Sequence, residues 1–341
     1  MSPRKAVTIR DVAQEAGVSP GTVSRAMRGS TLVNEETRQR IMAVVDDLNY
    51  TPNLAARRLS MGKTLVILVI VPFFTRPSVA ARLNGVVSVL AESEYDLLIH
   101  NISTPEQRAN CFKRIPHPNE VDGVLAISTV PTDEEAARLA EAELPIVFID
   151  ADHPALTMHH RVTVNDIEGG QVATDHLLAL GHRRIGFIGD AIDNPFNFIS
   201  SRNRYWGYCK ALNAAGIPVR PAYYAEGEHN RIAACGLTET LLSLPEPPSA
   251  IVAASDTQAV GVLETARKAG LRVPEDLSVI GYDDIEIAEV MQLTTMRQLL
   301  FESGRQGVEL LLDTLENPQI EAVHRILPTE LVVRASTAPP A

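Results

Sequence analysis

The sequence predicts an α/β protein in which a small all-α domain precedes two doubly wound parallel sheets. The start of the chain holds two short amphipathic helices with cap residues and a tight turn between them. From Leu65 onward, short apolar runs alternate with helical patterns in two successive series, which is typical of parallel strands joined by crossover helices. The length of 341 residues also exceeds what one hydrophobic core usually fills, so several domains are expected.

The first element is a helix that begins after Thr8, whose hydroxyl can accept a bond from an unpaired backbone N–H group. Apolar residues recur at helical spacing from Ile9 to Ala16, and Gly17 can end the helix with positive φ. Ser19 then caps a second helix that has Pro20 at its first position. Any helical hairpin would fit these caps, but the pair also fits a helix-turn-helix whose second helix presents its N-terminus to DNA bases.

A third helix follows from Asn34 to about Leu48, with Ile41, Val44 and Val45 on one face. Residues 1–63 contain ten Lys and Arg against six Asp and Glu, a net charge of +4. The whole chain carries −11, so the remainder carries −15. A basic head on an acidic body suits a phosphate-binding module attached to a domain that does not itself bind nucleic acid.

Composition excludes several other classes. Three scattered cysteines, Cys111, Cys209 and Cys235, fit a reducing cytoplasm rather than a disulfide framework. No run approaches the ~18 apolar residues of a membrane helix, and the polar start lacks the apolar region of a signal peptide. No cluster has metal-ligand spacing, and no arrangement of nucleophile and base stands out. We therefore expect no metal, no cofactor, no membrane contact and no enzyme activity.

The body of the chain contains two series of apolar segments that we interpret as strands buried on both faces. The first series is Leu65–Val71, Asp96–His100, Gly123–Ile127 and Ile146–Asp150, and the second is Arg184–Ile188, Ala250–Ala254 and Leu277–Tyr282. Helical patterns separate the strands within each series. Because ligands bind outside the carboxyl ends of such strands, pocket residues should directly follow each strand.

Several strings resemble the LacI/GalR family of bacterial repressors. In the head they are residues 8–13, 16–19, 22–25 and 48–53, and in the body residues 181–189, 270–276, 280–284 and 293–298. The resemblance implies a core similar to periplasmic sugar-binding proteins, in which the chain crosses between two subdomains near Asn165, Thr294 and His324. The implied domains are a helix-turn-helix at 1–52, a hinge helix and linker at 53–63, and an effector-binding and dimerisation domain at 64–341. Its N-subdomain would span about 64–164 and 295–324, and its C-subdomain about 165–294 and 325–341.

The resemblance also implies an effector pocket. Arg204 matches the family's effector-contacting arginine, and its planar fork can hold two vicinal hydroxyls or a carboxylate. Asp256 and Asp283 follow strands and match family positions that accept hydrogen bonds, although an Asp before a helix can instead be a cap. The further candidates are Asp150, Gln298, Arg76 and Ser78, together with His229, which stands where the family often has a stacking aromatic residue.

These side chains favour a small polyhydroxy effector, with a sugar or sugar derivative as the first choice. Two alternatives stay open. A purine could stack on Phe73, Phe74 or Phe196, and a phosphoprotein could act as corepressor. A glutamate and histidine at residues 228–229 and the unusual segment 72–78 depart from common family forms, which leaves the effector's identity open.

On the DNA side, Arg25 should carry much of the base readout, because Pro20 and Gly21 have no side chain that can hydrogen-bond a base edge. The smaller polar residues, which we expect at phosphates or caps, are Thr8, Ser19, Thr22 and Ser24. By resemblance the hinge helix also meets DNA, through Asn53, Ala56, Arg57 and a leucine wedge in the minor groove, Leu59.

Together these observations predict a cytoplasmic, effector-responsive transcriptional regulator, most simply a repressor, that binds operator DNA. A palindromic operator requires two recognition helices about one DNA turn apart, so a homodimer is expected. Helices near 78–92 and 301–315 supply apolar faces for it, and residues 334–341 lack the leucine heptads of a tetramerising coiled coil. A sugar-binding transport protein is the main alternative, and the sign of control is open.

Overall fold

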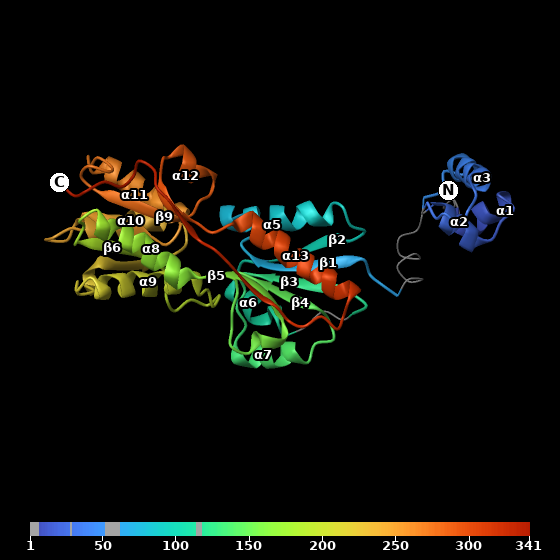
Figure 1. The fold of residues 1–341 in the computed structure, drawn as a ribbon, viewed down its shortest axis with the longest axis horizontal. Coiled ribbons are helices and arrows are strands. Elements are labelled where there is room, and N and C mark those ends of the chain that lie inside the picture. Colours follow the sequence, from blue (N-terminus) through green and yellow to red (C-terminus); the bar gives the residue numbers. More distant parts are fainter. Residues whose placement is uncertain (1–6, 28, 52–61, 114–117) are drawn as a thin grey trace. The chain divides into compact units, whose positions relative to one another are not determined.

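The computed structural model describes residues 7–27, 29–51, 62–113 and 118–341. The chain divides into two compact units, residues 1–64 and 65–341. Figure 1 shows a small helical unit and a larger unit built from two sheets with helices on their faces. The expected fold class, an all-α helix-turn-helix region followed by two mainly parallel α/β halves, is confirmed.

The helical unit contains α1 (Ile9–Glu15), α2 (Pro20–Met27) and α3 (Glu35–Asp47). Its caps are as predicted. Thr8 forms a capping box with Asp11, and the Asn34 side chain accepts a hydrogen bond from the Thr37 N–H group at 2.8 Å. Gly17 has a φ of +67° between α1 and α2, so glycine is well suited to this turn. Val12, Val23 and Ile41, one from each helix, are fully buried and join the three helices.

The first half of the larger unit is a parallel sheet with strand order β11-β5-β4-β3-β1-β2. Its strands are β1 (Val66–Pro72), β2 (Asp96–Ile102), β3 (Gly123–Ile127), β4 (Ile146–Ile149), β5 (His160–Val164) and β11 (His324–Leu327). Two helices, α5 (Pro77–Leu90) and α13 (Leu300–Glu316), lie side by side over one face (Figure 1). The other face is covered by α6 (Pro105–Cys111) and α7 (Asp133–Ala140).

The second half has strand order β12-β10-β9-β8-β6-β7, parallel except for the pair β10 and β12. Its strands are β6 (Ile185–Asp190), β7 (Tyr224–Gly227), β8 (Ala250–Ala253), β9 (Ser278–Asp283), β10 (Thr294–Arg297) and β12 (Glu330–Val332). Its helices are α8 (Asp166–Ala179) and α9 (Ser200–Ala214) on one face, α10 (Arg231–Leu242) and α11 (Asp256–Lys268) on the other, and the short α12 (Glu286–Val290). Short 3-10 turns lie at Leu156–Met158 and Pro221–Tyr223.

Three details differ from the sequence prediction, which did not list the strands β5, β7, β10, β11 and β12. The second and third crossings lie after Arg297 and after Leu327, a few residues later than the expected Thr294 and His324, because β10 still pairs with β9 and β11 still pairs with β5. The strand β2 is also not buried on both faces, since it forms the sheet edge and Leu98 and Ile99 are 52% and 39% exposed. In the described part of the chain, no helix is long and apolar enough to cross a membrane.

Candidate functional site

A cavity in the larger unit lies where the carboxyl ends of both sheets meet the N-termini of their helices. From the first half it is lined by Pro72, Arg76, Ser78, Val79, Arg82, Ser128, Val130 and Asp150. From the second half it is lined by Asp190, Phe198, Ile199, Ser200, Ser201, Arg204, His229, Ala254, Asp283 and Gln298. Its volume is about 70 Å³. The position after the strands is the one that the sequence analysis predicted from the parallel topology.

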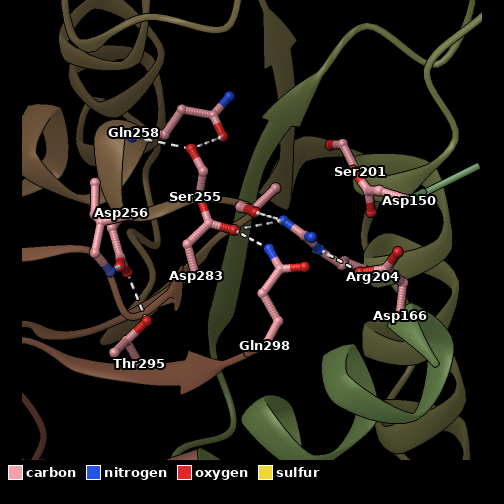
Figure 2. A network of polar contacts seen from close by, with 12 residues as sticks. Asp150, Asp166, Ser201, Arg204, Ser255, Asp256, Gln258, Asp283, Thr295 and Gln298 are labelled. Atoms are coloured by element: carbon pink, nitrogen blue, oxygen red, sulfur yellow. Dashed lines mark hydrogen bonds and ion pairs between the residues drawn. The ribbon is translucent and has the colours of Figure 1, made fainter. Parts of the chain in front are cut away.

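Arg204 on α9 is the centre of the polar network in the second half (Figure 2). Its Nε donates to the Asp166 carboxylate at 2.7 Å, and its Nη1 donates to the carbonyl oxygen of Ala254 at 2.6 Å and lies 3.5 Å from Asp283. The guanidinium also stacks on the ring of Tyr282 at 3.6 Å. Burial alone would lower the pKa of Arg204, but the charges of Asp166 and Asp283, the neighbouring Tyr282 and the hydrogen bond to Asp166 together outweigh burial and raise that pKa.

A second set of contacts joins the two halves across the cavity. Arg82 on α5 forms an ion pair with Asp150 at 3.0 Å and donates to the Gln298 side-chain oxygen at 3.0 Å. The Gln298 amide in turn donates to Asp283, so polar contacts run without a break from Arg82 to Arg204. Asp150 also accepts a hydrogen bond from Ser128 at 2.6 Å. Any change in the opening of the cleft must therefore rearrange buried charged groups.

A third cluster lies at the end of β6. Asp190 accepts hydrogen bonds from His229 Nδ1 at 3.0 Å and from the Gln258 amide at 3.0 Å. Burial raises the pKa of Asp190, but the charge of His229 and its hydrogen bond outweigh burial and hold that pKa below its usual value. Within the described ranges, no group of three or more His, Cys, Asp or Glu side chains is arranged to hold a metal ion.

Asp256 is the one predicted effector contact that does not line the cavity. Its carboxylate is fully buried and accepts a hydrogen bond from the Thr295 hydroxyl at 2.6 Å (Figure 2). It also accepts a hydrogen bond from the Ile285 N–H group at 2.9 Å. Burial and the nearby charge of Asp283 raise the pKa of Asp256 to about 8. The helix cap is Ser255, which accepts from the Gln258 N–H group. Asp256 therefore joins β10 and α12 to α11 rather than reaching the cavity.

The other seven predicted effector residues all line the cavity, namely Arg76, Ser78, Asp150, Arg204, His229, Asp283 and Gln298. Sequence reasoning missed Ser128 and Asp190, although both come at the ends of strands and the rule that found Asp150 could have found them. It also missed Arg82, which lies inside a helix and gives no such signal. Arg204 is less available than predicted, because its Nε and Nη1 already serve protein acceptors.

Backbone strain marks the same region. Ser128, Asp150 and Asp283 have φ values of 48°, 56° and 121°, and all three line the cavity. Residues other than glycine rarely adopt positive φ, and such residues tend to cluster at functional sites. The strain therefore supports this cavity as the functional site of the unit.

The aromatic residues that the purine alternative requires are largely occupied by one another. Phe196 and Phe198 stack with their centroids 5.4 Å apart, and Phe73 lies 5.0 Å from Phe196. Of these three rings, only Phe198 lines the cavity, and Phe74 is 43% exposed outside it. The polar character of the remaining lining favours the polyhydroxy ligand over a stacked base.

In the helical unit, the recognition helix α2 presents Arg25 to solvent, and its Nε contacts the Gly21 carbonyl oxygen at 3.2 Å. Ser19 accepts from the Thr22 N–H group at 3.2 Å and bonds the Thr22 hydroxyl, so these two residues serve the helix start. Pro20 is exposed and Ser24 is half-buried. The predicted hinge residues Asn53, Ala56, Arg57 and Leu59 lie outside the described residues.

Comparison with known proteins agrees with this architecture of a helix-turn-helix head and a ligand-binding body. The family model for "bacterial regulatory proteins, lacI family" matches residues 8–53, and that for a "periplasmic binding protein-like domain" matches residues 174–337. The HTH-type transcriptional repressor CytR of Escherichia coli K12 is 33% identical, over 97% of this chain and 96% of its own. The ribose operon repressor of Haemophilus influenzae is 32% identical, over 96% and 98%.

A solved lac repressor dimer bound to operator and the anti-inducer ONPF matches with a TM-score of 0.84 at 27% identity, over 98% of this chain and all of that one. The architecture and these matches define a DNA-binding transcriptional regulator and not an enzyme or a transport protein. The chain belongs to the LacI family of bacterial transcriptional regulators.

Proposed function

We propose that this chain is a homodimeric repressor whose affinity for operator DNA is set by a small polar effector bound in the cavity between the two sheets. The observation that carries the proposal is the lining of that cavity by residues from both halves, which meet through Arg82, Gln298 and Asp283. A ligand that replaces these contacts would change the relative stability of open and closed arrangements. Relatives named as repressors support the sign of control.

The effector proposed is a sugar or sugar derivative. The cavity offers guanidinium, hydroxyl, imidazole and carboxylate groups, which together can bond several hydroxyls of one ligand. A similar solved structure, the transcriptional regulator CelR–cellobiose complex, has 30% identity and a TM-score of 0.71 over 97% of this chain. The cavity volume of about 70 Å³ is about half of the ~150 Å³ cavity that holds benzene. Binding a sugar therefore requires the cleft to widen.

For the DNA complex we propose base readout by Arg25, because Pro20 and Gly21 at the start of the recognition helix have no side chain that can hydrogen-bond a base edge. Thr8, Ser19, Thr22 and Ser24 are proposed at phosphates or helix caps, and the hinge is proposed at 53–63 with Leu59 as the minor-groove wedge. The exposure of Arg25 on α2 supports the first assignment. We also propose that the regulator acts in the cytoplasm, where bacterial operator DNA is found.

Two residues support a dimer that uses α5 and α13. Val87 and Phe301, one on each of these packed helices, are each 47% exposed. The lac repressor match is a dimer on its operator. Sedimentation at low micromolar concentration should give the mass of two chains, and a mass of four chains would contradict this assembly.

The test of regulation is an operator titration. Compounds that raise the melting temperature are identified first, because a ligand that binds only the folded state stabilises it. Operator affinity is then measured by fluorescence anisotropy with and without each of those compounds. We expect at least one to change operator affinity in wild type, while Arg25→Ala keeps the thermal shift and binds operator more weakly. If the compounds bind but never change operator affinity, the regulatory proposal is wrong.

A further inference from the structure

In the cavity, the carboxylate acceptors have hydrogen-bond partners within the described part of the protein, whereas several N–H donors do not. The carboxylates already have donors: Asp150 from Arg82 and Ser128, and Asp190 from His229 and Gln258. Asp283 likewise accepts from Gln298. The acceptors of the cavity are therefore largely occupied by the protein, and a ligand gains little by donating to them.

On the wall formed by Arg76 and the start of α5, by contrast, several N–H donors lack an acceptor in the described ranges. Arg76 lines the cavity, and its guanidinium makes no hydrogen bond or ion pair with any described residue. It is held in place by rings instead, with its carbon 4.0 Å from the centroid of Phe73 and 5.6 Å from that of Phe198. A guanidinium stacked in this way leaves its N–H edge available for a planar anion. Burial lowers the pKa of Arg76, and the charge of Asp190 across the cavity offsets only part of this effect.

A second donor on this wall is buried without an acceptor. Arg82 is 3% exposed, and its Nε–H has no hydrogen-bond partner in the described part of the chain, although its Nη2 serves Gln298. Four other arginines, Arg38, Arg138, Arg161 and Arg202, also have an Nε–H without a hydrogen-bond partner among the described residues, but of the five only Arg82 lines the cavity, where a ligand could supply the acceptor. Ser78 lies one helical turn before Arg82 and also lines the cavity.

The helix itself adds to this wall. The helix α5 begins at Pro77 after Arg76, and it has no side-chain cap. The N–H groups of Ser78 and Val79 in its first turn therefore have no intrahelical acceptor, and both residues line the cavity. An uncapped helix start also carries partial positive charge. Here it is joined by two arginines whose donors are incompletely used.

We propose that the effector carries an anionic group, a carboxylate or a phosphate, that binds between Arg76, the Arg82 Nε–H and the first turn of α5. This inference rests on the proposed effector function of the cavity and specifies the effector as a sugar acid or a sugar phosphate rather than a neutral sugar. The anion supplies the acceptors that this wall lacks, and the polyhydroxy part faces Arg204 and His229 in the other half.

The first experiment measures thermal shifts of the full chain with inorganic phosphate against sodium chloride at equal ionic strength. We expect phosphate to raise the melting temperature of wild type and of Arg183→Gln. This control removes an exposed charge just before the N-terminal end of β6, the end opposite the cavity. Arg76→Gln should lose the increase. An absent increase in wild type, or an equal increase in Arg76→Gln, would overturn the proposal.

The second experiment separates the two sources of the anion by calorimetry with D-glucose, D-glucuronate and D-glucose 6-phosphate, and with D-ribose and D-ribose 5-phosphate. We expect an anionic member to bind at least about tenfold tighter than its neutral partner, and Arg76→Gln to remove that difference while Arg183→Gln keeps it. Preference for glucuronate identifies a carboxylate, and preference for a sugar phosphate identifies a phosphate. Neutral members that bind as tightly as the anionic ones would overturn the proposal.

The operator titration distinguishes a failure of the anion site from a failure of the proposed regulatory function. If an anionic compound binds through Arg76 but never changes operator affinity, the anion site stands and the regulatory function fails. If a neutral compound changes operator affinity equally in wild type and Arg76→Gln, the regulatory function stands and the anion site is wrong.

Discussion

The DNA-binding head and the effector cavity place their functional side chains in opposite environments. In the head, Arg25 is exposed, and its Nε donates to a backbone oxygen one turn away. In the cavity, Arg204 is 6% exposed and contacts Asp166, Asp283 and a backbone carbonyl of another element. Substitution of an exposed residue such as Arg25 should therefore have little effect on folding. Substitution of a buried cavity residue such as Arg204 should affect both the stability of the fold and ligand binding.

The largest expected effect is on stability, from Arg204→Ala. The substitution leaves Asp166 and Asp283 buried without their cation, which typically costs about 3–5 kcal/mol. Urea unfolding followed by the fluorescence of Trp206, the single tryptophan and a neighbour on α9, reports on this unit. Arg183→Ala is the control and should unfold like wild type. Equal midpoints for Arg204→Ala and wild type would show that the ion pairs contribute nothing.

Asp256 should make stability depend on pH. Its pKa is raised to about 8 in the folded chain, against about 3.9 for an unfolded Asp. The folded state therefore binds the proton more tightly, and this contribution to the free energy of unfolding is present below about pH 4 and lost as pH rises towards 8.

Asp256→Asn should flatten that dependence by up to about 1.4 kcal/mol per pH unit. A rotated amide can still accept from the Ile285 N–H group and donate to Thr295. Urea midpoints of both proteins between pH 5 and pH 8 measure the effect. Parallel pH curves for variant and wild type would show that Asp256 does not titrate in this range.

Arg25→Ala tests the other side of the comparison. We expect a loss of about 1–3 kcal/mol in operator affinity and a relaxed preference among operator variants, because a base contact is removed. Urea unfolding should not change. Arg40→Ala removes an equal charge from an exposed position on α3 and should leave the preference among variants intact. An unchanged preference in Arg25→Ala would assign base readout to other residues.

The smallest effect is expected from a helix cap in the head. Asn34→Ala removes the acceptor of the Thr37 N–H group and should cost about 1 kcal/mol. Amide hydrogen exchange in α3 should become about fivefold faster, while exchange in the sheets of the larger unit stays constant. Exchange that is unaffected in α3 would show that the cap does not limit the stability of the head.

The same contrast explains what the sequence could predict. Thr8, Gly17 and Asn34 act on neighbours within a few residues, so local patterns located the helices of the head correctly. The strand series likewise predicted both sheets and the edge on which the cavity lies. The bounds of β10 and β11 were harder to predict from the sequence, because they depend on pairing with strands that are distant along the chain.

Within the cavity, position after a strand predicted Asp150 and Asp283 but could not distinguish Asp256, which also follows a strand and bonds Thr295 instead. Of the hydrogen-bond donors on α5, the sequence predicted Ser78 but not Arg82. Arg82 reaches Asp150 and Gln298 through tertiary packing, and no local pattern separates it from an ordinary helix surface arginine.

In the proposed regulator, effector binding in the cavity and operator binding by the head are energetically coupled. The most direct test takes the compound that binds best in the calorimetric series and measures its dissociation constant with and without operator, and that of operator with and without the compound. We predict that both constants change by the same factor, between about 5 and 150. A factor of one in both directions, with tight binding of each ligand, would contradict the account.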